Sequence, residues 1–115
     1  LAGDQCLKSV ANLIDSTVRR PGDFVARYGG EEFAVLLSNT TEDGAAGLAE
    51  RIRTNVGNAI IDNGEAETSI TVSLGVAALI TTATMEPDDL IKAADCALYE
   101  AKNTGRNKVI KASSL

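Results

Sequence analysis

Two glycines and two carboxylates stand side by side in the segment Gly29-Gly30-Glu31-Glu32. Glycine pairs occur where the backbone needs a positive φ, or where a ligand must approach the main chain without meeting a Cβ. Adjacent glutamates repel each other unless they are solvated or bound to a cation. Mg²⁺ takes oxygen ligands and is commonly shared between one or two carboxylates and the phosphates of a nucleotide. The segment therefore indicates either a solvated turn or an acidic metal site, and Glu31 is the carboxylate expected to face the metal, because neighbouring strand residues point to opposite faces.

Two pairs of charged residues elsewhere in the chain are also candidates for chemistry. Lys102 lies near the end of an expected helix and Arg106 just beyond Gly105, which places two cations on one short turn. Such cations often only complement the helix dipole. Arg20 and Asp23 flank Pro21-Gly22, a spacing that by itself usually marks a surface ion pair.

The acidic segment is expected at the tip of a β-hairpin. Residues 24–28 and 32–37 are rich in residues that favour strands, and the glycine pair separates them. An alternating strand over residues 70–77 has one apolar face and one face of small side chains, which leaves room for a helix or a ligand. Residues 107–111 are expected to form a last short strand.

Three amphipathic helices are expected around these strands. The first begins near Asp4 and ends near Arg20, before Pro21. The second follows a capping-box pattern at Thr40 and Asp43, and the third runs from Pro87 to a left-handed cap at Gly105. The order is α-β-β-α-β-α-β, which predicts an α/β sandwich in which helices pack on a mostly antiparallel sheet, as in ferredoxin-like folds.

Composition limits the function further. The 115 residues are 44% hydrophobic, which suits one small domain over residues 1–115, and neither a spanning helix nor a signal segment is expected. The chain is therefore expected to be cytoplasmic, without direct membrane contact. A net charge of −5 argues against binding of long nucleic acid, and the absence of histidine leaves chemistry to carboxylates, Lys, Arg and metal ions. The two cysteines, Cys6 and Cys96, are expected to be reduced and buried.

Several segments, taken together and in order, resemble the GGDEF family, the diguanylate cyclases, in its GGEEF form. They are Gly3-Asp4 with Leu7, Arg27-Tyr28-Gly29-Gly30-Glu31-Glu32-Phe33, Thr71-Val72-Ser73-Leu74-Gly75-Val76-Ala77, Ala94-Asp95, Leu98-Tyr99, Ala101-Lys102 and Gly105-Arg106-Asn107. The resemblance implies an enzyme that joins two GTP molecules into cyclic di-GMP, releasing two pyrophosphates, with one GTP held by each subunit of a homodimer.

The resemblance also implies a role for each matching residue. Gly29 and Gly30 would line the nucleotide, Glu31 would bind Mg²⁺ or Mn²⁺, and Glu32 would complete the acidic catalytic site. Asp4 would contact the guanine edge, and Lys102 with Arg106 would hold the terminal phosphates.

The pair Arg20 and Asp23 has the offset from the glycine turn that resembles the family's inhibitory product site. Arg20 would donate to guanine O6 and N7 and Asp23 would accept from N1 and N2, with Arg51 as a secondary clamp on cyclic di-GMP. The alternative is that Arg20 and Asp23 are only solvent-exposed surface residues.

The family's first strand and first helix have no counterpart in the chain, so it is interpreted as an N-terminally truncated domain. In the family that strand is central in the sheet and carries an aspartate that shares the metal. The gap would be filled upstream or by a partner chain, and the 115 residues alone are expected to make no cyclic di-GMP. The alternative functions are a non-catalytic module that senses cyclic di-GMP or GTP, and a bare dimerisation domain.

Overall fold

The computed structural model describes residues 2–29, 31–62, 67–78 and 87–115. Its helices are α1 (Ala2–Thr17), α2 (Glu42–Asn58) and α3 (Pro87–Asn103). Its strands are β1 (Phe24–Gly29), β2 (Glu32–Leu36), β3 (Ile61–Asp62), β4 (Glu67–Thr68), β5 (Leu74–Val76) and β6 (Val109–Lys111), followed by a 3₁₀ turn at Ala112–Ser114. The predicted order of elements is confirmed, and the short pair β3–β4 is an addition to it.

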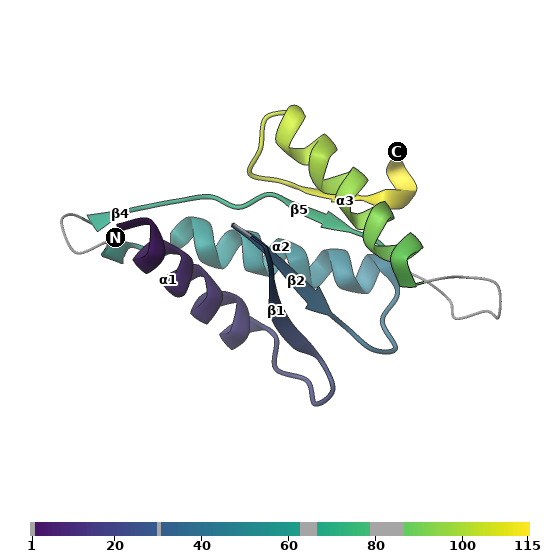
Figure 1. Ribbon diagram of the computed structural model, residues 1–115, viewed down its shortest axis with the longest axis horizontal. Coiled ribbons are helices and arrows are strands. Elements are labelled where there is room, and N and C mark those ends of the chain that lie inside the picture. Colours follow the sequence, from purple (N-terminus) through teal and green to yellow (C-terminus); the bar gives the residue numbers. More distant parts are fainter. Residues whose placement is uncertain (1, 30, 63–66, 79–86) are drawn as a thin grey trace.

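The strands of the described residues form three two-stranded sheets. The β1–β2 and β3–β4 pairs are antiparallel, whereas β5 and β6 are parallel. Figure 1 shows the β1–β2 hairpin next to α1, while β5 runs along α2 and packs against α3. The α/β architecture predicted from the sequence is therefore present, with most of its strand pairs antiparallel.

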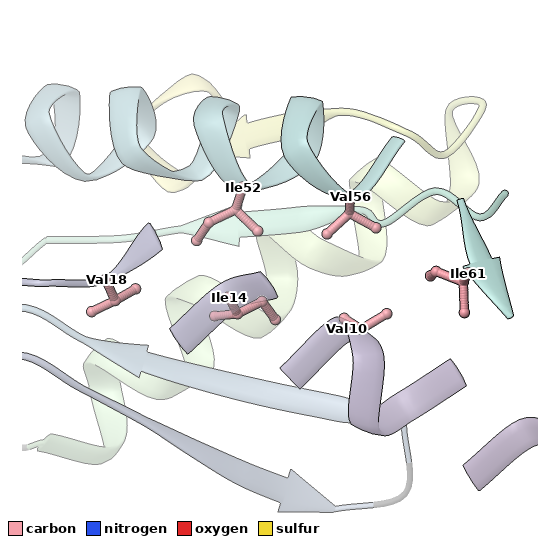
Figure 2. Packing of buried hydrophobic residues seen from close by; sticks show 6 residues of the cluster. All are labelled: Val10, Ile14, Val18, Ile52, Val56 and Ile61. Carbon is pink, nitrogen blue, oxygen red and sulfur yellow. The ribbon is translucent and has the colours of Figure 1, made fainter. Parts of the chain in front are cut away.

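The hydrophobic core lies between α1 and α2. Figure 2 shows Val10 and Ile14 of α1, with Val18 just after its end, facing Ile52 and Val56 of α2, and Ile61 of β3 lies beside them. The spacing of three and four residues places these side chains on one face of each helix. Full burial of one such side chain contributes about 1.5–3 kcal/mol. Val25, Phe33 and Val35 of the hairpin pack against this cluster, so the same core holds the hairpin to the helices.

The small-residue face of β5 packs against α3 rather than a ligand. A Cβ built on Gly75 would lie 2.2 Å from the carbonyl oxygen of Ala94 and 2.3 Å from the backbone nitrogen of Leu98. Leu74, the preceding residue, packs against the core on the other side of the strand. The absence of a side chain at Gly75 thus lets the backbone of α3 lie directly on β5.

Three local predictions were wrong in detail. The N-cap of α2 is Thr41, whose side chain accepts a hydrogen bond of 3.0 Å from the Gly44 backbone, so the capping residue is one position later than the Thr40 pattern indicated. The expected strand over residues 70–77 is regular only in β5, because pairing with β6 covers that part alone. Both cysteines are free as predicted, but neither is buried: Cys6 is half-buried, and Cys96 is exposed because it lies on the outer face of α3.

Within the described ranges, no helix combines the length and the apolar character needed to cross a membrane.

Candidate active site

The acidic segment lies at the tip of the β1–β2 hairpin, as the sequence predicted. Gly29 pairs with Glu32, so only two residues join the strands, and the register shifts between Arg27 and Gly29. Glu31 is an exposed turn residue and Glu32, the first residue of β2, is half-buried. Gly30 lies outside the described residues. The tight connection therefore presents Glu31 to solvent and turns Glu32 toward the body of the domain.

The end of α3 meets this tip. The Nζ atom of Lys102, in the last turn of α3, lies 3.9 Å from Oε1 of Glu32, and both side chains are about two-fifths exposed, at 40% and 43%. A pair with this exposure contributes little to stability, typically under about 1 kcal/mol. Its importance is positional, because it brings a candidate phosphate-binding cation to the candidate acidic site from a distant part of the chain.

Arg106 follows Lys102 on the turn that ends α3. Its backbone N–H donates to the Ala101 carbonyl at 2.9 Å, and Gly105 has a φ of +115°. This combination is the Schellman arrangement, in which a residue with positive φ lets the chain satisfy the last free carbonyls of a helix. The predicted glycine cap is confirmed, and it places exposed Arg106 one turn beyond Lys102.

The remaining candidate for nucleotide binding is only partly described. Asp4 lies in the first turn of α1, but its side chain is outside the described residues. Its predicted contact with guanine therefore stays a prediction.

Arg20 and Asp23 form a closed pair between the end of α1 and the loop after β2. Nε of Arg20 donates to Oδ2 of Asp23 at 2.7 Å, and its Nη2 donates to the Ser38 carbonyl at 2.6 Å and to Oγ1 of Thr40 at 2.7 Å. The other oxygen of Asp23 accepts from the Ser38 backbone N–H at 3.0 Å. The Asp23 side chain is only 3% exposed, against 55% for Arg20.

This geometry has two consequences for the predicted product site. Arg20 presents more than half of its side chain to solvent, which suits ligand binding, but the Asp23 carboxylate is already occupied by Arg20 and Ser38. A guanine base would have to displace contacts of Asp23 before this carboxylate could accept from it. Arg51, the third predicted residue, lies on the exposed face of α2.

The Arg20 contact also makes the stability of the domain depend on pH through Asp23. The hydrogen bond from Arg20, helped by that from the Ser38 backbone, lowers the pKa of Asp23 below its ordinary value of 3.8. A carboxylate with a lowered pKa stabilises the folded chain fully above its unfolded pKa, and this stabilisation is lost as the pH falls through the folded pKa. We expect the Asp23→Asn variant to be less stable at pH 7, with a gap to the wild type that shrinks below about pH 4. Urea unfolding between pH 7 and pH 2 measures the gap, and a gap that stays constant would contradict the assignment.

The donor set at the hairpin tip is suited to a divalent cation only in part. Glu31 and Glu32 offer the one or two carboxylates that Mg²⁺ commonly uses together with substrate phosphates. In the described part of the chain, no group of three or more acidic, cysteine or histidine side chains gathers as a metal cluster. A bound ion would therefore take its other ligands from the nucleotide, from water or from residues beyond those described.

Two features of this region were missed by reasoning from the sequence. One is a hollow of about 270 Å³ between α1 and the inner face of the hairpin, lined by Leu7, Val25 and Phe33 and by the charged Lys8, Asp15 and Arg27. The other is a contact between Arg53 of α2 and Asn107 of the turn after α3. Both features form between segments that are apart in the sequence, so no local sequence pattern predicts them.

An α/β domain in which an acidic hairpin tip meets a cationic helix end is suited to hold a polyphosphate with its counter-ion. The chain matches the family described as diguanylate cyclase, GGDEF domain, over residues 1–108. It is 46% identical over 109 residues to the probable diguanylate cyclase DgcT of Escherichia coli K12, and the match covers 94% of this chain and 24% of that protein. The chain belongs to the GGDEF family, and the resemblance inferred from its motifs is confirmed.

Solved structures of GGDEF domains are also similar to this chain. The GGDEF domain of DgcB from Caulobacter crescentus, in complex with c-di-GMP, is 34% identical with a TM-score of 0.85, over 96% of this chain and 65% of that one. The active GGEEF domain of a diguanylate cyclase from Vibrio cholerae has the same identity and TM-score, over 96% of this chain and 68% of that one. The chain spans about a quarter of the length of the curated relative DgcT.

Proposed function

We propose that this chain is the catalytic domain of a diguanylate cyclase, which condenses two GTP molecules into cyclic di-GMP and two pyrophosphates. The observation that carries the proposal is the approach of Lys102 to Glu32, which joins the cationic end of α3 to the acidic hairpin tip. Membership of the family and the likeness to a domain bound to c-di-GMP support it.

Each side chain has one proposed task. Lys102 and Arg106 bind the β- and γ-phosphates, since an ammonium and a guanidinium both donate to phosphate oxygens. Gly29 and Gly30 let the nucleotide approach the hairpin backbone, and Asp4 accepts from the guanine edge. Glu31, with Glu32 beside it, would hold Mg²⁺ or Mn²⁺, which when bound neutralises charge on the phosphates and favours ionisation of the attacking hydroxyl.

The reaction forms two phosphodiester bonds and breaks two phosphoanhydride bonds. The 3′-hydroxyl of each GTP attacks the α-phosphorus of the other, loses its proton, and displaces pyrophosphate in line with the new bond. One chain binds one GTP, so two chains must face each other for both attacks to occur. Catalysis therefore depends on a homodimer that positions the two nucleotides.

The test is the reaction itself. The full-length protein is incubated with GTP and Mg²⁺ or Mn²⁺, and cyclic di-GMP and pyrophosphate are quantified. We expect two pyrophosphates for each cyclic di-GMP, and a rate that rises more than linearly with protein concentration where the dimer dissociates. Binding of GTP without turnover would instead indicate a nucleotide-sensing module.

The 115-residue chain assayed in parallel is expected to give no measurable product. Within the described residues the metal would rest on one or two carboxylates at the hairpin tip, and Mg²⁺ gives up water reluctantly for so few ligands. Turnover by the 115-residue chain would refute this expectation.

Arg20, Asp23 and Arg51 are proposed to bind cyclic di-GMP as a feedback inhibitor. The exposed fork of Arg20 can donate to guanine O6 and N7 once it leaves Ser38 and Thr40. We expect Arg20→Ala to raise the cyclic di-GMP concentration needed for half-inhibition by roughly 5-fold to 100-fold, the range for loss of a bidentate contact to guanine.

The matched control is Arg19→Ala, which removes the neighbouring guanidinium, bonded to the Ser16 carbonyl at 2.7 Å. Inhibition curves measured at one fixed GTP concentration compare the two variants with the wild type. Equal half-inhibition values for all three proteins would exclude Arg20 from the inhibitory site.

A further inference from the structure

The turn that carries Arg106 has an unusual backbone. Gly105, Arg106 and Asn107 have φ values of +115°, +61° and +47° in succession. Arg106 and Asn107 have side chains, and residues with side chains adopt this left-handed region at a cost in free energy. Contacts with the surrounding structure must therefore hold the turn in its conformation.

Hydrogen bonds from the backbone of the turn and its neighbours, on two sides, supply part of this support. The N–H of Arg106 donates to the Ala101 carbonyl at 2.9 Å, which ties the turn to α3. The N–H of Asn107 donates to Oγ of Ser73 at 3.1 Å, and the N–H of Leu74 donates to the Lys108 carbonyl at 2.9 Å. These two bonds tie the turn to the start of β5 and the residue before it.

A third support comes from α2. Nη1 of Arg53 donates to Oδ1 of Asn107 at 3.1 Å, while its Nε donates to the two carboxylate oxygens of Glu50 at 2.9 and 3.0 Å. Glu50 thus fixes the guanidinium plane of Arg53, whose side chain is 27% exposed, before it reaches Asn107. The same hydrogen bonds lower the pKa of Glu50 below its ordinary value.

We propose that Arg53 and Ser73, acting through Asn107, are positioning residues that hold Arg106 in place for the nucleotide phosphates. Asn107 adjoins Arg106, so its two contacts restrain the residue that follows the phosphate-binding guanidinium. A backbone held in its bound conformation before binding leaves less conformational freedom to be lost when Arg106 meets its ligand, and affinity rises accordingly. The inference rests on the proposed role of Arg106.

Loss of the Arg53–Asn107 contact should lower the affinity for the nucleotide phosphates rather than the stability of the fold, which distinguishes it from a purely structural contact. Glu50 is half-exposed and Asn107 is exposed, so water can replace Arg53 at both groups with little change in the stability of the fold. A turn that is no longer restrained should weaken the contacts of Arg106 with the phosphates. The affinity for the guanosine part of the nucleotide should stay unchanged.

A double-mutant cycle in the full-length protein tests this. Binding of a non-hydrolysable GTP analogue and of guanosine is measured by calorimetry for the wild type, Arg53→Ala, Arg106→Ala and the double variant. We expect Arg53→Ala to weaken binding of the analogue by about 5-fold to 10-fold, to leave guanosine within about 2-fold, and to have no further effect when Arg106 is already alanine.

Three further variants distinguish a positioning role of Arg53 from an effect of its charge or of the stability of the fold. Arg53→Lys keeps the charge but lacks the planar fork whose separate nitrogens bond Glu50 and Asn107, so it should behave like Arg53→Ala. Thr54→Ala, an exposed neighbour on α2, is the matched control and should bind like the wild type. Ser73→Ala removes the other contact of Asn107, and gives an independent measurement if the Arg53 variants lower the urea midpoint.

Several outcomes would overturn the proposal. They are full rescue by Arg53→Lys, equal losses for the analogue and guanosine, and an Arg53→Ala effect that persists in the Arg106→Ala background. If Arg106→Ala weakens binding of the analogue but neither Arg53→Ala nor Ser73→Ala does, only the positioning role fails. If Arg106→Ala itself has no effect, the proposed phosphate role of Arg106 fails as well.

Discussion

Gly75→Ala is expected to lower the free energy of unfolding by about 3 kcal/mol or more, and so to remove much of the stability of a domain of this size. The new Cβ would lie 2.2 Å from the Ala94 carbonyl oxygen and 2.3 Å from the Leu98 nitrogen. Both atoms belong to the backbone of α3, so no change of side-chain rotamer can relieve the overlap. The helix must move away from β5, and its buried residues Ala97 and Ala101 would lose their packing.

Gly47→Ala is the matched control, because it adds the same methyl group to the same kind of residue. Nothing lies within 4 Å of a Cβ built on Gly47, which occupies an exposed position in α2. Alanine there should stabilise the chain by about 0.5–1 kcal/mol, since glycine loses more backbone entropy in a helix. Urea unfolding followed by circular dichroism compares the two variants, and a Gly75→Ala midpoint equal to that of the wild type would contradict the packing of α3 on β5.

Gly75 also illustrates how far the sequence determines the fold. The alternation around it predicted a strand with a small-residue face, and this pattern is local. The partner of that face was left open between a helix and a ligand, because a sequence does not state which distant segment will cover a surface. The same limit applies to Cys96, which lies among small apolar residues in a helical pattern but is on the exposed side of α3.

In the candidate site, too, the local features were predictable from the sequence and the long-range contacts were not. The hairpin tip and the cap at Gly105 follow from glycine and strand patterns within a few residues, and both were predicted. The approach of Lys102 to Glu32 is a long-range contact that only the family resemblance anticipated. The support of Asn107 by Arg53 was missed, because a lone arginine on a helix gives no signal of its partner.

Glu31→Gln is expected to reduce cyclic di-GMP synthesis by the full-length protein about 100-fold or more, the usual cost of removing one preorganised stabilising group from an active site. The substitution keeps the size of the side chain but removes the charge that a divalent cation requires. Glu31 is exposed on the turn, so the stability of the fold should change by less than about 0.5 kcal/mol. A loss of activity would then report chemistry rather than folding.

The control for this change is Glu67→Gln, which removes a charge from an exposed residue of β4 and should leave turnover unaffected. Binding of a GTP analogue is measured with Mg²⁺ and with a chelator. The wild type should bind more tightly with the metal, and Glu31→Gln should lose that gain while its affinity in the chelator stays the same. The acidic tip is proposed to act only through a cation. Two results would therefore remove the reason for placing the active site there: turnover by Glu31→Gln equal to that of the wild type, or wild-type affinity for the GTP analogue that is the same with Mg²⁺ and with the chelator.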